Sequence, residues 1–433
     1  MSPELIGAIG IVVMTVFMFL RMPIAFTMAL VGFIGFTYLT SLNGSLFLLS
    51  NGFYFQFTSY TMLVVPLFVL MGEICFHAGI SKRLYDTAYA WLGFIPGGLA
   101  LATIGACAGF AAICGSSAAT AATMGTVALP EMKKFNYDKS FATGTVAAGG
   151  TLGILIPPSI VLIVYGMQVE VSIGKLFIAG ILPGLVLSAL FMVCILIMCL
   201  TRPALGPAAP KTTLKQKIKS LSGTIETLLL FFLVIGGLIV GWFTPTEAAG
   251  IGAAGAISIG VVTQNLNWEK FKKALLGTTR TSAMVLLIIG CAMIFSRFLT
   301  VSRLPQALAQ WVDELHTSPY LVLTCVMIIY ILGGCFMDAL SFMIITINIF
   351  YPMIVAAGFD PIWFGVIIVV LLETGAVTPP VGINVYVIKG IAPEVELYTI
   401  FRGIVPFLMM MFICLVILTI FPEIALVLPK LIK

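Results

Sequence analysis

Long, continuously apolar runs recur through the whole chain and restrict what it can fold into. Six of the clearest are residues 3–20, 24–40, 61–76, 176–200, 225–243 and 403–421. About 20 apolar residues in a helix span the hydrocarbon core of a bilayer, and a helix satisfies its own backbone hydrogen bonds there. With 61% hydrophobic and only 9% charged residues, the chain cannot cover a water-soluble globule. The sequence therefore predicts an all-α polytopic membrane protein.

Cysteine and histidine usage indicates neither a metal centre nor a disulfide framework. The nine cysteines show no CxxC spacing and lie in apolar stretches, where cysteine behaves as a small hydrophobe. The two histidines, His77 and His316, lie in opposite halves, so we expect no metal pair. The N-terminus lacks the basic segment and cleavage site of a removable signal peptide, so we expect the first helix to be retained.

The two halves of the chain resemble each other at an offset of about 222 residues. This offset aligns Pro23 with Pro245, Pro130 with Pro352, and the pair Pro157-Pro158 with Pro379-Pro380. We count five ordinary crossings in each half, and an odd number of crossings inserts the second repeat upside down relative to the first. The sequence therefore predicts two inverted-topology repeats.

Basic residues orient this arrangement. With the N-terminus outside, 17 of the 22 lysine and arginine residues fall on the cytoplasmic side, as the positive-inside rule requires. This orientation predicts that both termini are periplasmic. It makes the basic, proline-containing segment 201–223 a flexible cytoplasmic linker between the halves.

Each half also contains one segment that is not an ordinary span. Residues 105–126 are mostly small, and Gly115-Ser116-Ser117 interrupts them, which favours a re-entrant hairpin over about 96–134 that enters from the cytoplasm. A pair of close-packed helices, re-entrant or fully spanning, is the alternative. The matching hairpin over about 319–356 enters from outside and carries Asp338 opposite Ser116. An aspartate deep in an apolar run costs about 2.5–3.5 kcal/mol, so it needs an ion or a partner such as backbone amides.

A double proline interrupts the segment that follows each hairpin. Proline lacks a backbone N–H and disfavours helix in the residue before it, so we expect broken helices over about 140–167 and about 361–389. A break inside the membrane exposes carbonyls that can coordinate a cation and helix termini that attract an anion. A kink that serves only packing is the alternative for one such site.

We expect most of the remaining acidic residues near these elements to stabilise the helices rather than to bind ions. Glu373, just before the second break, is either an ion ligand or, preferably, an anchor that holds other ligands in place. Asp138 and Asp360 read as helix caps. Glu73 and Glu247 are expected to cap helices or to pair locally, without a role in the site.

Taken together, these features resemble the large membrane subunit of the tripartite ATP-independent periplasmic (TRAP) transporters. Four motifs carry the resemblance: GSSAATAATMG at 115–125, GTLGILIPPS at 150–159, FMDALSF at 336–342 and ETGAVTPPVGINVYV at 373–387. The resemblance covers essentially the whole chain. It implies an elevator-type carrier of the bacterial inner membrane, without enzymatic activity, that imports a small organic acid.

The resemblance also implies a division of the chain into two units. A scaffold would comprise residues 1–93 and 224–315, and a transport domain would comprise residues 94–200 and 316–425. Expected partners are a smaller four-helix membrane subunit, a periplasmic substrate-binding protein and the lipid bilayer, with no nucleic acid. Sialic acid and C4-dicarboxylates are common substrates of the family, and the sequence does not choose between them.

By the same resemblance, two or more sodium ions serve as coupling ions and no other cofactor is expected. The first sodium site would match Ser116, Ser117, Gly150 and Thr151, and the second Asp338, Ser341, Gly375 and Thr378. The substrate would lie between these sites, near Ser117, Thr120, Pro157, Pro158, Pro379, Pro380 and Asn384. No lysine or arginine falls at the predicted midplane, so helix N-termini and bound cations would hold a carboxylate.

Three other readings compete. A stand-alone sodium/dicarboxylate carrier of the related inverted-repeat superfamily would share the hairpins but need no binding protein. A channel would favour a repeated filter sequence, and none is seen. A membrane-embedded enzyme would need a nucleophile–base pair or a metal-ligand cluster, and the apolar segments contain neither.

Overall fold

The computed structural model describes residues 2–20, 22–210, 212–314 and 318–431, and within these ranges it contains helices and no β-strand. Among these residues, eight helical segments are long and apolar enough to cross a membrane, and five shorter helices are also apolar. The predicted all-α, multi-pass architecture is therefore confirmed. His316 lies outside the described residues.

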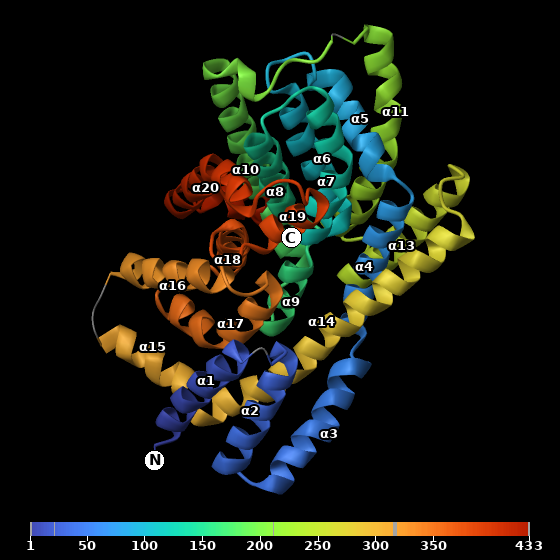
Figure 1. Cartoon of the computed structure of the whole chain (residues 1–433). Helices are drawn as coiled ribbons and strands as arrows, with labels where there is room; N and C mark the ends of the chain where they lie inside the picture. The colour runs from blue at the N-terminus through green and yellow to red at the C-terminus, as the bar shows by residue number, and fades with distance from the viewer. Residues whose placement is uncertain (1, 21, 211, 315–317, 432–433) are drawn as a thin grey trace.

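The first half of the chain runs from the blue to the green elements of Figure 1. Its elements are α1 (Pro3–Phe19), α2 (Ile24–Leu39), α3 (Leu42–Thr58), η1 (Tyr60–Leu63), α4 (Val64–His77), α5 (Ile80–Leu92), α6 (Gly98–Cys114), α7 (Ser117–Lys134), α8 (Lys139–Leu155), α9 (Ile160–Gln168), α10 (Ile173–Thr201) and η2 (Pro203–Leu205).

The second half follows in yellow-green to red (Figure 1). Its elements are α11 (Leu214–Phe231), η3 (Phe232–Gly236), α12 (Gly237–Val240), α13 (Pro245–Val262), α14 (Trp268–Ser302), α15 (Leu304–Glu314), α16 (Pro319–Gly334), α17 (Ala339–Ala356), α18 (Pro361–Val377), α19 (Ile383–Ile391), α20 (Leu397–Ile420) and α21 (Glu423–Lys430).

Polar residues begin the helices where the sequence places them. Asp138 caps α8 by accepting from the Phe141 N–H at 2.9 Å. Asp360 caps α18, with Pro361 at the first helical position. Glu247 forms a capping box with Thr244 at the start of α13. These side chains satisfy N–H groups that a helix leaves open at its first turn, so the three predicted caps are confirmed.

The double prolines break two helices as predicted. Helix α8 ends at Leu155 and α9 begins at Ile160, while α18 ends at Val377 and α19 begins at Ile383. Every residue of α8 from 141 to 155, and every residue of α18 from 363 to 377, is buried. The two broken helices therefore lie in the core, where every neighbour is protein.

Helix α14 is the longest helix among the described residues and packs against the helices of the first part of the chain. Its 35 residues span about 50 Å, and it packs along α2, α3 and α4. Figure 1 shows it in yellow, crossing diagonally towards α1 and α2. The helices approach closely because Gly32 of α2 has no side chain, and a Cβ there would lie 2.8 Å from the Phe295 backbone.

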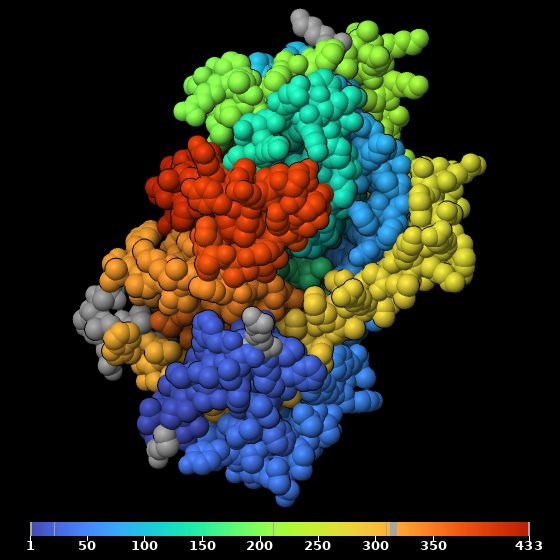
Figure 2. All heavy atoms as spheres, viewed as in Figure 1, coloured from blue at the N-terminus to red at the C-terminus, as the bar shows by residue number. Residues whose placement is uncertain are grey.

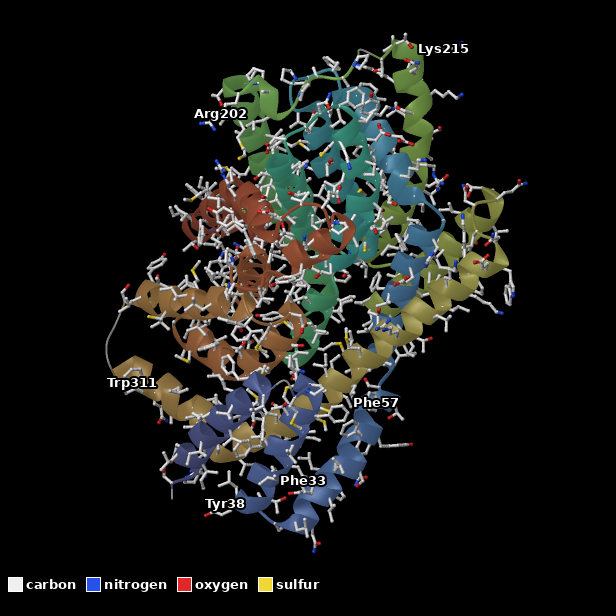
Figure 3. The ribbon with its side chains drawn as sticks, in the orientation of Figure 1. Phe33, Tyr38, Phe57, Arg202, Lys215 and Trp311 are labelled. Carbon is white, nitrogen blue, oxygen red and sulfur yellow. The ribbon has the colours of Figure 1, made fainter. Side chains whose placement is uncertain are left out.

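The predicted linker 201–223 is only partly correct. Helix α11 begins at Leu214, so the second half of that segment is helical. Thr213 and Gln216 form a reciprocal capping box there, and this local signal outweighs the lysine-rich composition on which the prediction rested. Figure 3 shows Arg202 and Lys215, which flank the remaining connection, at the end of the molecule opposite Tyr38.

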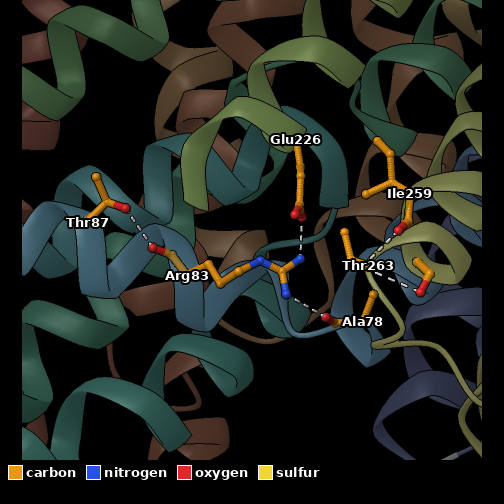
Figure 4. A network of polar contacts seen from close by, with 7 residues as sticks. Ala78, Arg83, Thr87, Glu226, Ile259 and Thr263 are labelled. Atoms are coloured by element: carbon orange, nitrogen blue, oxygen red, sulfur yellow. Dashed lines mark hydrogen bonds and ion pairs between the residues drawn. The ribbon is translucent and has the colours of Figure 1, made fainter. Parts of the chain in front are cut away.

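Helix α11 is fastened to α5 by polar contacts (Figure 4). The Arg83 guanidinium of α5 pairs with the Glu226 carboxylate of α11 and also donates to the Ala78 carbonyl at 3.1 Å. The Thr87 hydroxyl donates to the Ser220 carbonyl at 2.6 Å. Both side chains of the ion pair are less than a quarter exposed, so this joint holds the start of the second half against the first.

Candidate functional site

The tip of the first helical hairpin lies against the first helix break. Helices α6 and α7 pack on each other and meet at Gly115 and Ser116. Gly115 has φ +70°, a left-handed conformation that favours glycine. A Cβ at this position would lie 2.9 Å from the Pro158 carbonyl oxygen. The tip and the double proline are thus in direct contact.

The second hairpin repeats this relationship with a different contact. Helix α16 ends at Gly334, and its backbone touches α18 just before the second break, where a Cβ on Gly375 would lie 2.6 Å from the Gly334 Cα. Asp338 caps α17 by accepting from the Ser341 N–H at 3.0 Å. Ser116 caps α7 in the same way, by accepting from the Ala119 N–H at 3.4 Å. Ser116 and Asp338 therefore occupy equivalent positions at the starts of the second hairpin arms.

The residues expected at the first sodium site lie on two helices that pack against each other, α7 and α8. Gly150 faces Ala121, and a Cβ on Gly153 would lie 2.5 Å from the Ser116 carbonyl oxygen. The Thr151 hydroxyl is buried and donates to the Ala148 carbonyl at 2.6 Å, which leaves its lone pairs as acceptors. The arrangement offers several oxygen atoms near the hairpin tip.

Proline chemistry adds acceptors at this break. Pro157 and Pro158 carry no N–H, so the carbonyls of Gly153 and Ile154 lack the donors that a continuous helix would supply. These carbonyls lie at the C-terminal, negative end of the α8 dipole. Hard cations such as sodium prefer oxygen ligands of this kind.

The residues expected at the second sodium site differ in how their oxygen atoms are hydrogen-bonded. Besides its contact with Asp338, Ser341 has a buried hydroxyl without a hydrogen-bond partner among the described residues. The Thr378 hydroxyl donates to the Thr374 carbonyl at 2.6 Å, and the Gly375 carbonyl accepts from the Thr378 N–H at 2.9 Å. Ser341 is therefore the residue of this set whose hydroxyl is buried and forms no hydrogen bond among the described residues.

The two breaks differ in how they are covered. Pro157 and Pro158 are buried, whereas Pro379 and Pro380 are exposed. Among the other expected substrate neighbours, Thr120 is buried and donates to the Ser116 carbonyl at 2.8 Å, and Ser117 is partly exposed. In this conformation the second break is the more open one.

One contact within the site was not predicted. The fully buried Asn384 of α19 donates from Nδ2 to Oε2 of Glu373 in α18 at 3.3 Å. Glu373 thus joins the two sides of the second break. The anchoring role preferred for it remains a prediction. The signal in the sequence was a carboxylate 11 residues before an asparagine, across a helix breaker.

The hairpin tips face two different cavities. Ser116 lines a cavity of about 180 Å³ together with Glu73 of α4 and Thr281 of α14. Asp338 lines a larger, mainly apolar cavity of about 690 Å³ between α1, α2, α16 and α17. Glu73 pairs locally with His77 at 3.7 Å, as expected, but its place beside Ser116 was not foreseen. Figure 2 shows the surface recessed between the red α19 region and the yellow α14.

This fold, with paired hairpins set against paired broken helices inside a many-span bundle, defines a multi-pass membrane transport protein. The family model described as "Tripartite ATP-independent periplasmic transporter, DctM component" matches residues 11–424. The chain therefore belongs to this family of TRAP transporter large permease proteins, which confirms the resemblance seen in its motifs.

Similar proteins cover most of the chain. The C4-dicarboxylate TRAP transporter large permease protein of Pseudomonas aeruginosa is 40% identical over 86% of both chains. The sialic acid TRAP transporter large permease protein of Vibrio cholerae is 32% identical over 96% of both. Among solved structures, the YdaH transporter of Alcanivorax borkumensis matches with a TM-score of 0.55 and 16% identity over 88% of both chains, a likeness of fold alone.

Proposed function

We propose that the chain is the large membrane subunit of a sodium-coupled TRAP transporter that imports a small organic acid. The observation that carries this proposal is the contact between each hairpin and its broken helix, with Ser116 and Asp338 at equivalent caps. Similar proteins are named for C4-dicarboxylates and for sialic acid, so the proposed substrate is a carboxylate of this general size.

In this proposal two sodium ions bind at the two sites expected from the sequence. The first takes oxygen ligands from Ser116, Ser117, Gly150 and Thr151. The second takes them from Asp338, Ser341, Gly375 and Thr378. The substrate carboxylate then lies between the hairpins, near Asn384, where bound cations and helix N-termini compensate its charge.

The energetics favour more than one coupling ion. A tenfold sodium gradient supplies about 1.4 kcal/mol per ion, and a 100 mV potential about 2.3 kcal/mol per net charge moved. Two ions carrying one monoanion inward therefore supply roughly 5 kcal/mol, enough for a several-thousandfold accumulation. A single ion would make the same step electroneutral and much weaker.

Transport would proceed by an elevator movement in the inner membrane. Residues 94–200 and 316–425 would move as one unit against a scaffold of residues 1–93 and 224–315, and both termini would face the periplasm. A small four-helix membrane subunit would work with this chain, and a periplasmic binding protein would deliver the substrate, consistent with a family described as tripartite.

Uptake into proteoliposomes tests this function. The purified chain by itself should transport neither sialic acid nor succinate. Once the small subunit and the loaded binding protein are added, a sodium gradient should drive uptake of the substrate. Omission of each component in turn gives the control. Robust uptake of free substrate by the chain alone would instead support a stand-alone carrier.

A further inference from the structure

A polar cavity distinct from those at the hairpin tips lies beside the C-terminal half of α14. It has a volume of about 480 Å³, within the range of small-molecule sites. The joint between α3 and α4, the end of α9 and the middle of α17 form its other walls. Figure 3 labels Phe57 at this joint, beside α14.

Two opposite charges line this cavity. Arg297 comes from α14 and Glu170 follows α9, and both side chains are exposed. They do not pair with each other, and within the described part of the chain neither forms an ion pair with any other group. An unpaired guanidinium in a concave site is a ready partner for a carboxylate, which it can bind through two parallel hydrogen bonds.

Uncharged hydrogen-bonding groups make up much of the remaining lining. Gln168 and Asn348 offer amides, and Thr300 offers a hydroxyl, while Gln56 faces them from the scaffold side. Among the described residues, no side-chain hydrogen bond occupies the amides of Gln168 and Asn348. Their donors and acceptors are thus open to a ligand.

We propose that this cavity is a binding site for a small hydroxylated monocarboxylate. Arg297 binds the carboxylate, and the amides and Glu170 accept and donate hydrogen bonds to the hydroxyl groups. A dicarboxylate fits less well. Arg297 is the one cation among the described residues that line the cavity, so the second carboxylate of such a ligand would meet Glu170 or neutral groups. A carboxylate beside the like charge of Glu170 is destabilised, and a carboxylate without a cation is costly to desolvate.

The position of the site gives it a role, which rests on the proposed function. Arg297 and Gln56 belong to the proposed scaffold, whereas Glu170, Gln168 and Asn348 belong to the proposed transport unit. A ligand in the cavity would bridge the two units on the periplasmic side, and movement of one against the other would separate its contacts. The cavity would therefore receive the substrate and release it as the transport unit moves.

Ligand protection of a cysteine tests the site without any transport. Thr300→Cys is introduced beside Arg297 in a Cys325→Ser background, because Cys325 is the one exposed native cysteine among the described residues. The chain in detergent is treated with N-ethylmaleimide, a neutral reagent, in the presence of D-gluconate or succinate. Gluconate should slow the modification, and succinate at the same concentration should slow it much less.

Matched variants assign the effect to Arg297. Arg297→Gln should raise the gluconate concentration for half-protection by about tenfold or more, since it removes hydrogen bonds to a charged group. Arg297→Lys, which keeps the charge, should retain part of the protection. Lys175→Gln removes another exposed cation, predicted on the same side and absent from the cavity lining, and should change nothing.

Equal protection by succinate would overturn the ligand class. Protection that is absent, or that Arg297→Gln leaves unchanged, would overturn the site, and so would an equal loss in Lys175→Gln. A single sharp gel-filtration peak for each variant verifies that the chain remains folded. Because no gradient or partner enters the assay, its failure is distinct from a failure of sodium-driven uptake.

Discussion

Glu373 and Asn384 face each other across the second helix break, where the Asn384 amide donates to one carboxylate oxygen of Glu373 at 3.3 Å. The other carboxylate oxygen of Glu373 and the amide oxygen of Asn384 are both buried without a partner among the described residues. Buried acceptors that lack donors are unusual, because each costs part of its desolvation free energy. This pair therefore gives a specific prediction about stability.

Glu373→Gln should leave the unfolding temperature unchanged or raise it. The new amide nitrogen can donate to the Asn384 oxygen, so the pair becomes reciprocal, and the substitution removes a charge from the membrane interior. Glu373→Ala should lower the stability by about 1–3 kcal/mol, since it leaves the Asn384 amide unpaired. Thermal unfolding in detergent, followed by intrinsic fluorescence, measures both. Equal losses in the two variants would show that the pairing is not what stabilises this break.

Asp338→Asn should raise the sodium concentration needed for half-maximal uptake without loss of folded protein. Asparagine caps a helix about as well as aspartate does, so the start of α17 should persist while a charged ligand is lost. Ser116→Ala should act in the same direction more weakly, because it removes a neutral ligand.

Asp138→Asn is the matched control, since Asp138 also caps a helix but lies outside the proposed sodium sites. Uptake by reconstituted transporter over a range of sodium concentrations gives the comparison. An Asp338→Asn variant whose sodium dependence equals that of Asp138→Asn would leave Asp338 as a helix cap alone.

Gly403→Ala should destabilise the protein by about 1–3 kcal/mol. Helices α8 and α20 cross at this residue, and a Cβ on Gly403 would overlap the Ser140 carbonyl oxygen, so the crossing must open. Gly390→Ala is the control, since a Cβ at that exposed helical position meets nothing within 4 Å. It should stabilise α19 by about 0.5–1 kcal/mol. Thermal unfolding of both variants tests the difference in sign.

Cysteine labelling tests the orientation in the membrane. Ser2 and Ser222 are both exposed. Ser2 caps α1 near the N-terminus, and Ser222 lies in the middle of α11. With the N-terminus outside, an impermeant thiol reagent added to whole cells should label Ser2→Cys and spare Ser222→Cys in a cysteine-depleted background. The reverse pattern would invert the topology. A C-terminal probe at Lys433 would lie outside the described residues.

Local chemistry explains what the sequence alone determined. The apolar runs specify membrane helices, and the proline pairs specify where two of them break, because proline lacks the N–H that a helix requires at that residue. The caps Asp138 and Asp360 were predictable for the same reason: each acts within three residues of itself. The family followed from short motifs placed on these elements.

The tertiary structure alone decided which of these pieces meet. The pairing of Arg83 with Glu226, the crossing of α8 and α20 at Gly403 and the cavity that joins Arg297 to Gln168 all combine segments far apart in the chain. Side chains separated by 100 residues or more leave no periodic or local signal in one sequence, since their proximity results from how helices pack. For the same reason the sequence could not predict that the two breaks differ in exposure. Pro157 and Pro379 have similar neighbours in sequence, but packing buries Pro157 and leaves Pro379 exposed.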